Sequence, residues 1–447
     1  MKFSGAQVLG ALPPPTVPLV ESLIAAAESH RASIHLVGGP VRDLLLDRRI
    51  RDVDVVIEPR GRFGATELAK AAAPRGADVQ VYDRFGTVRL ATPEASIDVA
   101  TLRREHYRHP AALPKVEPGN LEEDLLRRDF SVNALALPLR SRGRSELVDP
   151  VDGQADLERR VLRVLHARSF HDDPTRALRA GRLAPRLGFR LARGSRSLLG
   201  EALRDGAFDT VSGDRLRREF DKLFDDASRD LDPALALRQL SQWGVLSALE
   251  PGLELPRESL APVRRFGRAT RSPPWRMGRF RPWAAGLSVW LAPLPANLRK
   301  RVLERLSVRG EARQRIAGFP TQTLVLLEPL AKARGRGAVD ALLLGVDEEQ
   351  LHALHAWAAT PVRRRIVRWA AEDRTRRSPV TGNDLTGIGI SGPAVGRALA
   401  RIRVGFLDGA VANREEGLAL AREISHQRNP GRGKARKRPT GKGGKRR

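Results

Sequence analysis

Apolar residues follow two different periods along this chain. In the first third they form short runs of four or five positions, whereas beyond residue 157 they recur every three or four positions. The short runs predict β-strands at 34–37, 53–57, 79–82, 87–91 and 97–100. Helical patterns come before or between these runs, at 18–27, 41–46 and 66–73. This alternation predicts a small α/β unit that ends near Leu139.

Beyond Leu157 the pattern predicts helices that are interrupted by Gly and Pro. Residues 168–189 and 212–224 are each predicted to form one helix, and Ser212 has the side chain expected of an N-cap. The Arg- and Trp-rich segment 256–295 has two interpretations, a packed helical linker or a contact with RNA. No repeat of solenoid period is present.

The composition restricts the classes of partner. The chain has 447 residues and a formal net charge of +27, which favours RNA, DNA or an anionic membrane surface as a partner. It contains no cysteine, so disulfides and thiolate metal sites are excluded. No stretch approaches the apolar length of a membrane span, and residues 13–15 are prolines where a signal peptide needs its apolar core. We therefore expect a cytoplasmic protein.

Part of the positive charge lies at the C-terminus. Residues 428–447 contain ten Lys or Arg and no acidic residue, interleaved with Gly and Pro, which predicts disorder. Two roles remain open for this segment, a solubilising terminus or an arm that binds RNA without sequence preference. We do not expect catalysis to depend on it.

Two carboxylates follow a glycine pair in the stretch from residue 36 to 58. Asp52 and Asp54 are two positions apart at the start of a predicted strand, so we expect both to point to the same side of it. Carboxylates are the ligands that Mg²⁺ prefers, and two such ions activate a hydroxyl and stabilise a leaving oxyanion. Gly38 and Gly39 leave room for a phosphate chain, and Asp98 is a candidate third acid on a later strand. The alternative is a solvated strand edge without a metal.

A second group of polar residues lies in the sequence RRDFSVNAL. Arg127 and Arg128 have the charge to neutralise phosphate, while Asp129 and Asn133 offer hydrogen bonds suited to a ribose. The alternative is an ordinary ion pair at a domain junction.

The third group is the sequence DDPTR. Asp173 and Arg176 are three residues apart within a predicted helix, so we expect them to be neighbours on one helix face. A carboxylate accepts from an exocyclic amine and a guanidinium donates to a ring nitrogen or carbonyl, so this pair suits cytosine and adenine rather than guanine and uracil. The alternative is an intrahelical salt bridge.

In their order along the chain these motifs resemble a known family. The succession GG-x-VRD-LL…DxD, FGT, RRDF-S-x-NA, DD-P-x-R-x-x-RA and S-x-D-R, over about residues 34–224, is similar to the bacterial class II RNA nucleotidyltransferases, which are the tRNA CCA-adding enzymes and their poly(A) polymerase relatives. The resemblance implies an α/β head with a mixed sheet and a polymerase-β-like nucleotidyltransferase fold, followed by all-α neck, body and tail domains. The implied boundaries are 1–140 for the head, 141–225 for the neck, 226–425 for the body and tail, and 426–447 for the basic segment.

The resemblance also implies roles for individual residues. Asp52 and Asp54 would bind two Mg²⁺ ions, with Asp98 as a further catalytic acid. The residues that bind the triphosphate would be Gly38, Gly39 and Arg42. Those around the sugar and phosphates would be Arg128, Asp129 and Asn133. The base-reading element would contribute Asp173, Arg176 and Arg179. The substrates would be CTP and ATP, and the partner would be the acceptor arm of tRNA. Neither a membrane nor a stable protein partner is expected.

The implied reaction is template-independent addition of C, A or both to the 3′ end of tRNA. Several segments look like the branch that includes A-adding enzymes, and the loop after Leu102, which carries Arg104 and Glu105, argues against an enzyme that adds only C. Two alternatives remain: a poly(A) polymerase on the same scaffold, and an RNA-binding protein with an inactive head. We expect His352 and His355 to have a surface or packing role rather than to bind metal.

Overall fold

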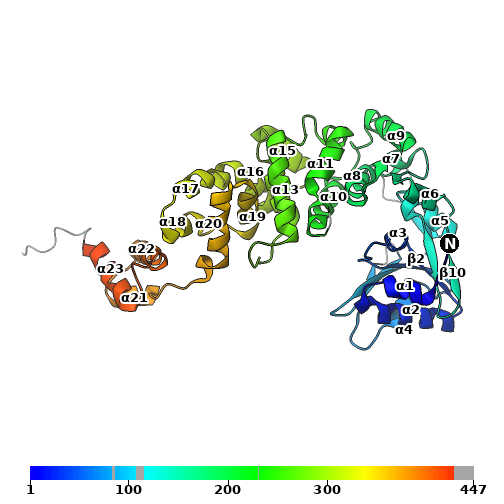
Figure 1. Cartoon of the computed structure of the whole chain (residues 1–447), viewed down its shortest axis with the longest axis horizontal. Coiled ribbons are helices and arrows are strands. Elements are labelled where there is room, and N and C mark those ends of the chain that lie inside the picture. Colours follow the sequence, from blue (N-terminus) through cyan, green and yellow to red (C-terminus); the bar gives the residue numbers. More distant parts are fainter. Residues whose placement is uncertain (83–85, 107–114, 230, 427–447) are drawn as a thin grey trace, which may run out of the picture. The chain divides into compact units, whose positions relative to one another are not determined.

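The computed structural model describes residues 1–82, 86–106, 115–229 and 231–426. The chain forms two compact units, the first made of Met1–Arg257 with Pro295–Arg309 and the second of Glu258–Leu294 with Gly310–Arg447 (Figure 1). The predicted boundaries near residues 140 and 225 both fall inside the first unit, so this division does not test them. The predicted basic segment lies outside the described residues, apart from its first position.

A six-stranded mixed sheet forms the centre of the head, in the order β4-β5-β6-β3-β2-β9 (Figure 1, blue to cyan). Its strands are β2 Ser33–Val37, β3 Asp54–Glu58, β4 Asp78–Tyr82, β5 Thr87–Ala91, β6 Ser96–Thr101 and β9 Ala136–Leu139. β3 and β6 are parallel, and the other neighbouring pairs are antiparallel. The predicted strands and the mixed sheet are therefore confirmed, and the sheet ends at the predicted residue.

Short helices connect the strands, as the apolar pattern predicts. They are α2 Val17–Ser29, α3 Gly39–Leu45 and α4 Ala65–Ala72. α2 and α4 bury their apolar faces, which is the usual way for a sheet to cover its hydrophobic side. The remaining elements of the head are β1 Lys2–Ser4, α1 Gly5–Ala11, η1 Pro14–Thr16, β7 Arg103–His106, β8 Lys115–Pro118, α5 Leu121–Leu126 and η3 Ser131–Asn133, with β10 Arg144–Glu146 paired to β1.

The rest of the first unit is helical, as predicted, apart from a two-stranded parallel sheet. These elements are α6 Gly153–Glu158, β11 Val161–Leu162, α7 Ser169–Asp172, α8 Thr175–Leu187, β12 Arg190–Leu191, α9 Arg193–Arg204, α10 Gly213–Asp225, η4 Asp226–Ser228, α11 Pro233–Gln242, α12 Val245–Leu249 and α15 Ala296–Arg305. Ser212 is the N-cap residue of α10, as expected, but its side chain makes no capping hydrogen bond.

The predicted single helix over 168–189 is wrong in one respect, because the chain breaks at Asp173. This residue has φ −137° and ψ 90°, an extended conformation between α7 and α8. Proline disfavours the helical conformation in the residue before it, and Pro174 follows directly. Asp173 and Arg176 therefore do not share a helix face, since only Arg176 lies in α8.

The second unit is helical in its described residues, and its helices bury apolar side chains. Its helices are α13 Arg257–Arg271, α14 Pro282–Leu291, α16 Gly310–Gln322, α17 Leu327–Lys332, α18 Gly335–Leu343, α19 Glu348–Trp357, α20 Thr360–Ala371, α21 Gly382–Gly387, α22 Pro393–Asp408 and α23 Arg414–His426, with short turns η5 Leu324–Leu326 and η6 Asp373–Thr375. One apolar core includes α18 to α20, and another includes α21 to α23. No helix of the described residues is long and apolar enough to cross a membrane.

The Arg- and Trp-rich segment packs into the second unit. Trp275 is 4% exposed, and its Nε1 donates to Glu348 Oε1 at 2.6 Å. His352 and His355 are buried beside this ring, so the packing role expected for them is confirmed. At Trp275 the structure supports the packed linker over the contact with RNA.

Candidate functional site

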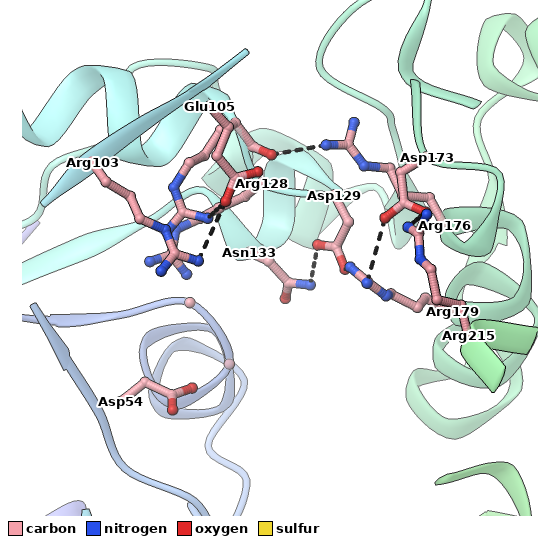
Figure 2. A pocket seen from close by; sticks show the side chains of 13 residues that line it. Asp54, Arg103, Glu105, Arg128, Asp129, Asn133, Asp173, Arg176, Arg179 and Arg215 are labelled. Atoms are coloured by element: carbon pink, nitrogen blue, oxygen red, sulfur yellow. Dashed lines mark hydrogen bonds and ion pairs between the residues drawn. The ribbon is translucent and has the colours of Figure 1, made fainter. Parts of the chain in front are cut away.

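One cavity of the first unit gathers most of the residues that the motifs single out. Its volume is about 460 Å³. Figure 2 shows residues of the head on one side and residues of the following helices on the other. The lining consists of Gly38, Gly39, Asp54, Arg103, Glu105, Arg127, Arg128, Asp129, Asn133, Asp173, Arg176, Arg179 and Arg215.

The glycine pair forms the turn from β2 into α3. Gly38 has φ +73°, a conformation that residues with a side chain rarely adopt. A Cβ on Gly38 would lie 2.7 Å from Arg128 Nη1, so the glycine also lets this guanidinium approach the backbone. The backbone of the turn and the guanidinium of Arg128 therefore lie on the same wall of the cavity.

Asp54 is the acidic residue of the glycine-strand motif that lines the cavity. It is the first residue of β3, and the parallel register places it beside Asp98 of β6. Burial raises the pKa of Asp54 to about 6; Arg128 opposes the rise, and the carboxylates of Asp98 and Asp52 add to it. Burial also raises the pKa of Asp98, against the opposing effect of Arg89.

Asp52 differs from the prediction. The strand begins only at Asp54, so the alternation of side chains along a strand does not extend to Asp52. The Asp52 side chain is 67% exposed, does not line the cavity, and lies 3.0 Å from Arg229 Nη1 in an ion pair. Asp98 is likewise absent from the lining. The three acids are neighbours, but only Asp54 faces the cavity directly.

The carboxylates at this site are suitable ligands for a hard divalent cation whose coordination shell is completed by oxygens of the substrate. Among the described residues no group of three or more His, Cys, Asp or Glu could hold a metal ion. Mg²⁺ in phosphoryl-transfer sites, however, is usually held by one or two carboxylates with phosphate oxygens and water. Such a cation would stabilise the ionised form of Asp54, whose pKa is raised first by burial and further by Asp98 and Asp52.

A buried carboxylate orients the two arginines of the RRDF motif. Asp124 has a fully buried side chain, and it lies 2.6 Å from Arg127 Nη2 and 2.9 Å from Arg128 Nη2. Burial acts to raise the pKa of Asp124, but Arg128 and Arg127 outweigh it, so the pKa is lowered and the carboxylate stays charged. Both arginines line the cavity, so these ion pairs also position two guanidinium groups at the site. Sequence reasoning missed Asp124, although its spacing from the arginines was available.

Asp129 and Asn133 lie side by side on the cavity wall. Asn133 Nδ2 donates to Asp129 Oδ1 at 2.9 Å. Arg42, which was expected to hold the triphosphate, is 4% exposed and is not part of the lining. It donates instead from Nη1 to Asn133 Oδ1 at 2.7 Å.

Asp173 and Arg176 both line the cavity, but each is held by other residues. Asp173 Oδ1 accepts from Arg215 Nη2 at 2.8 Å and from the hydroxyl of Thr175 at 2.5 Å. Burial opposes ionisation of Asp173, yet Arg179 and Arg215 outweigh it and its pKa is lowered.

Arg176 is 2% exposed, and its Nη2 donates to the carbonyl oxygen of Arg127 at 2.9 Å, while Nη1 donates to Ser169 Oγ at 2.5 Å. The side chains of Asp173 and Arg176 thus bond to different partners, which speaks against the intrahelical salt bridge.

Arg179 connects the two sides of the cavity. Its guanidinium lies 3.5 Å from Asp173, 3.4 Å from Glu219 and 3.9 Å from Asp129. Since Asp129 belongs to the head and the other two to the helices that follow, Arg179 holds both walls in one charged network.

Four lining residues are outside the predicted site set, and one of them, Arg127, had been considered as a charge for phosphate. Arg215 belongs to the S-x-D-R motif, which was recognised without a role. Arg103 and Glu105 come from β7, where Glu105 lies 3.3 Å from Arg103 and 2.9 Å from Arg127. The sequence does not show that this hairpin reaches the cavity, and most of its predicted loop, residues 107–114, lies outside the described residues.

Comparison with known proteins places these residues in a family context. Residues 34–163 match the family model of the poly A polymerase head domain. The chain is 31% identical to an A-adding tRNA nucleotidyltransferase of Geobacter sulfurreducens over 92% of its own length and 47% of that protein. It is 27% identical to an A-adding tRNA nucleotidyltransferase of Halalkalibacterium halodurans, over 92% of this chain and 93% of the other. A CC-adding tRNA nucleotidyltransferase of Deinococcus radiodurans is 42% identical over 49% of this chain and 56% of that protein.

Solved structures give the same picture over most of the chain. A CCA-adding enzyme in an apo form has a TM-score of 0.74 and 29% identity, covering 96% of this chain and 99% of that one. The Thermotoga maritima CCA-adding enzyme in complex with tRNA has a TM-score of 0.69 and 28% identity, covering 95% and 99%. The chain spans about half or less of the length of several relatives, 47% of the Geobacter protein among them. The motifs, the sheet and these likenesses over most of the chain support a bacterial class II tRNA nucleotidyltransferase.

Proposed function

We propose that this protein adds C, A or both to the 3′ end of tRNA without a template. The terminal 3′-hydroxyl of the RNA attacks the α-phosphate of CTP or ATP, the bond to the β-phosphate breaks, and pyrophosphate leaves. One observation carries the proposal: a single cavity contains a glycine turn with Arg128, the carboxylate of Asp54 and the buried pair Asp173 and Arg176. The absence of cysteine agrees with a reducing compartment, and we place this activity in the cytoplasm.

In this proposal the triphosphate lies against the glycine turn. The backbone at Gly38 and Gly39 leaves space for it, and Arg128 neutralises its charge. Two Mg²⁺ ions, held by Asp54 and Asp52 together with the phosphates, would activate the attacking hydroxyl and stabilise the leaving oxygen. Arg229 must then release Asp52, because its guanidinium bonds the same carboxylate.

The base lies at the opposite end, against Asp173 and Arg176. Asp173 remains ionised because its pKa is lowered, so it accepts hydrogen bonds from an exocyclic amine but donates none. Arg176 also lines the cavity, and its guanidinium would donate to a ring nitrogen or carbonyl of the base. An acceptor beside a donor matches cytosine and adenine. Guanine and uracil present a carbonyl where the amine is required.

The narrower form of the proposal is addition of the terminal A. Two relatives that align over 92% of this chain are A-adding tRNA nucleotidyltransferases. The second candidate is a poly(A) polymerase, which the head-domain match at residues 34–163 also supports. Head residues do not separate the two, because both reactions use ATP, a metal ion and an RNA hydroxyl.

The test offers the purified protein three RNAs: a tRNA that lacks its CCA end, a tRNA that ends in C-C, and an unstructured RNA. Each is incubated with CTP, ATP or both, and the products are sequenced. We expect extension of the tRNAs that stops at the terminal A, with release of pyrophosphate. Long A-tails on the unstructured RNA would support the poly(A) polymerase instead, and RNA binding without any incorporation would contradict an enzyme.

A matched pair of variants links the activity to the cavity. Asp54→Asn removes the carboxylate and should abolish incorporation, whereas Glu58→Gln changes an exposed acid at the far end of the same strand and should not. Equal activity of Asp54→Asn and the wild type would contradict the proposed site.

A further inference from the structure

Arg42 does not line the cavity, but it forms a hydrogen bond to a residue that does, Asn133. Its side chain is 5% exposed, and the neighbouring Asp43 side chain is 11% exposed. Arg42 Nε and Nη2 both lie 2.8 Å from Asp43 Oδ1, so the carboxylate fixes the guanidinium and neutralises its charge. The remaining terminal nitrogen, Nη1, points the other way and donates to Asn133 Oδ1 at 2.7 Å.

This contact determines which way the Asn133 amide faces. A guanidinium only donates, so it selects the oxygen of the amide and turns the NH₂ group away from itself. The NH₂ group then donates to Asp129 Oδ1 at 2.9 Å. The backbone N–H of Phe130 donates to the same oxygen, also at 2.9 Å.

The result is a carboxylate with one engaged oxygen and one available oxygen. Asp129 Oδ1 receives two donors, whereas Oδ2 accepts no hydrogen bond from the described residues and lies 3.9 Å from Arg179 Nη1, beyond hydrogen-bond distance. Asp129 lines the cavity between the glycine turn and Asp173 (Figure 2). An available carboxylate oxygen at that place suits a sugar hydroxyl, which is a donor.

We propose that Arg42 is a positioning residue for recognition of the sugar of the incoming nucleotide. It holds Asn133, which in turn holds Asp129 with its free oxygen available to a ribose hydroxyl. The proposal rests on the proposed function, since it requires a nucleoside triphosphate in this cavity. It assigns Arg42 a role different from contact with the triphosphate, and the two roles predict different effects on binding.

The test measures equilibrium binding of ATP, 2′-deoxyATP and 3′-deoxyATP to the full chain in the presence of a divalent cation. The variant is Arg42→Lys, which keeps a positive charge next to Asp43 but cannot span both Asp43 and Asn133. We expect the wild type to prefer ATP over at least one deoxy analogue. In the variant, the ratio of the affinities for ATP and the deoxy analogue should fall about tenfold, because ATP alone binds more weakly. This factor corresponds to the loss of one hydrogen bond to a charged group.

Arg48→Lys is the matched control, because Arg48 follows the same helix and donates to the carbonyl of Arg186 on the surface. It should leave the preference unchanged. The ratio of two affinities does not depend on how much of the preparation is folded, so a merely structural role would not move it. If Arg42→Lys does not fold, Asp43→Asn loosens Arg42 while retaining it and should shift the ratio in the same direction.

Two results would overturn this proposal and leave the proposed function intact. One is a wild type that binds ATP and both deoxy analogues equally. The other is an Arg42→Lys variant that loses affinity for all three nucleotides by the same factor, as a triphosphate contact would. A wild type that binds no nucleotide would instead overturn the proposed function, and this proposal with it.

Discussion

Asp54 combines burial with a requirement for charge. Its pKa is raised to about 6 by burial and by the neighbouring carboxylates, although Arg128 acts in the opposite direction. A carboxylate must be ionised to bind a divalent cation, so the same environment that prepares the site for a cation is unfavourable when none is bound. Stability and activity therefore place opposite demands on this residue.

Asp54→Asn should stabilise the cation-free protein while it abolishes activity. The folded-state pKa lies above the value of an unfolded Asp, so the wild type is penalised wherever Asp54 is ionised. The penalty is largest above pH 6 and becomes small as the pH falls toward 4, where the carboxyl is protonated in the folded state and partly protonated in the unfolded state. We expect a gain of about 2–3 kcal/mol in the free energy of unfolding at neutral pH. Urea unfolding in a chelating buffer at pH 7.5 and pH 4 measures it, and an equal gain at both pH values would contradict the assignment.

Gly38 provides a second prediction at the level of one residue. Gly38→Ala introduces strain at a positive φ and a Cβ that would lie 2.7 Å from Arg128 Nη1. Gly61→Ala is the matched control, since Gly61 has φ +58° and open space around its Cβ position. Both variants should lose about 1 kcal/mol of stability. Only Gly38→Ala should also lose ATP affinity, by about tenfold or more, in a binding titration; equal affinities in the two variants would mean that the Arg128 contact is unimportant.

At the level of elements, the start of β3 is connected to the segment after η4. The ion pair between Asp52 and Arg229 joins residues that are 177 positions apart in the sequence. This segment lies beyond the residues that match the poly A polymerase head model, so the match alone does not reveal the contact. A cation bound at Asp52, as in the proposed function, would compete with the Arg229 guanidinium for this carboxylate.

Arg229→Ala should therefore bind the catalytic cation more tightly. We expect the Mn²⁺ concentration at half-saturation, measured by the paramagnetic signal of the free ion, to fall about two- to fivefold, in line with the modest strength of an exposed ion pair. Arg238→Ala, which changes an exposed residue on α11, is the control and should have no effect. Weaker binding of Mn²⁺ by Arg229→Ala would show that Arg229 supports the cation site instead of competing with it.

Elements with a continuous apolar pattern were predictable from the sequence, and long-range contacts were not. The strand runs and helices of the head follow from periodicity, because burial on a sheet dictates which positions are apolar. The break at Asp173 was also within reach, since Pro174 restricts the residue before it. The burial of Arg42 and the pairing of Asp52 with Arg229 depend on which distant residues meet, and no local pattern encodes that.

At the level of the whole molecule, the second unit contains two buried histidines among aromatic rings. His352 stacks on Phe280 with ring centroids 5.1 Å apart, and it makes an edge contact with Phe266 at 5.2 Å. Burial lowers the pKa of His352 to about 3, with a further effect of His355 and a smaller opposing effect of the Ala269 backbone. Burial, with Arg363 and Arg265, lowers the pKa of His355 to about 4. Both rings are therefore neutral in the folded protein at physiological pH.

Acid should destabilise the protein in a defined pH range. An unfolded histidine takes up a proton near pH 6.5, whereas these two do not until about pH 4 or below, so the stability that they contribute is complete above pH 6.5 and is lost as the pH falls toward 4. His352→Phe keeps a ring in the aromatic cluster without a titrating group. Its melting temperature should fall less between pH 7 and pH 5 than that of the wild type, as measured by calorimetry, and an identical fall would contradict the prediction.

The contact between Arg176 and position 127 has a consequence for how such a protein tolerates mutation. Arg176 donates to the main-chain oxygen of Arg127, not to its side chain. Any amino acid at position 127 supplies that oxygen, so a substitution there keeps the hydrogen bond between the two walls of the cavity. In the proposed function, the position of Arg176 therefore depends on a main-chain atom of residue 127, and a change of the side chain at that position would not remove this hydrogen bond.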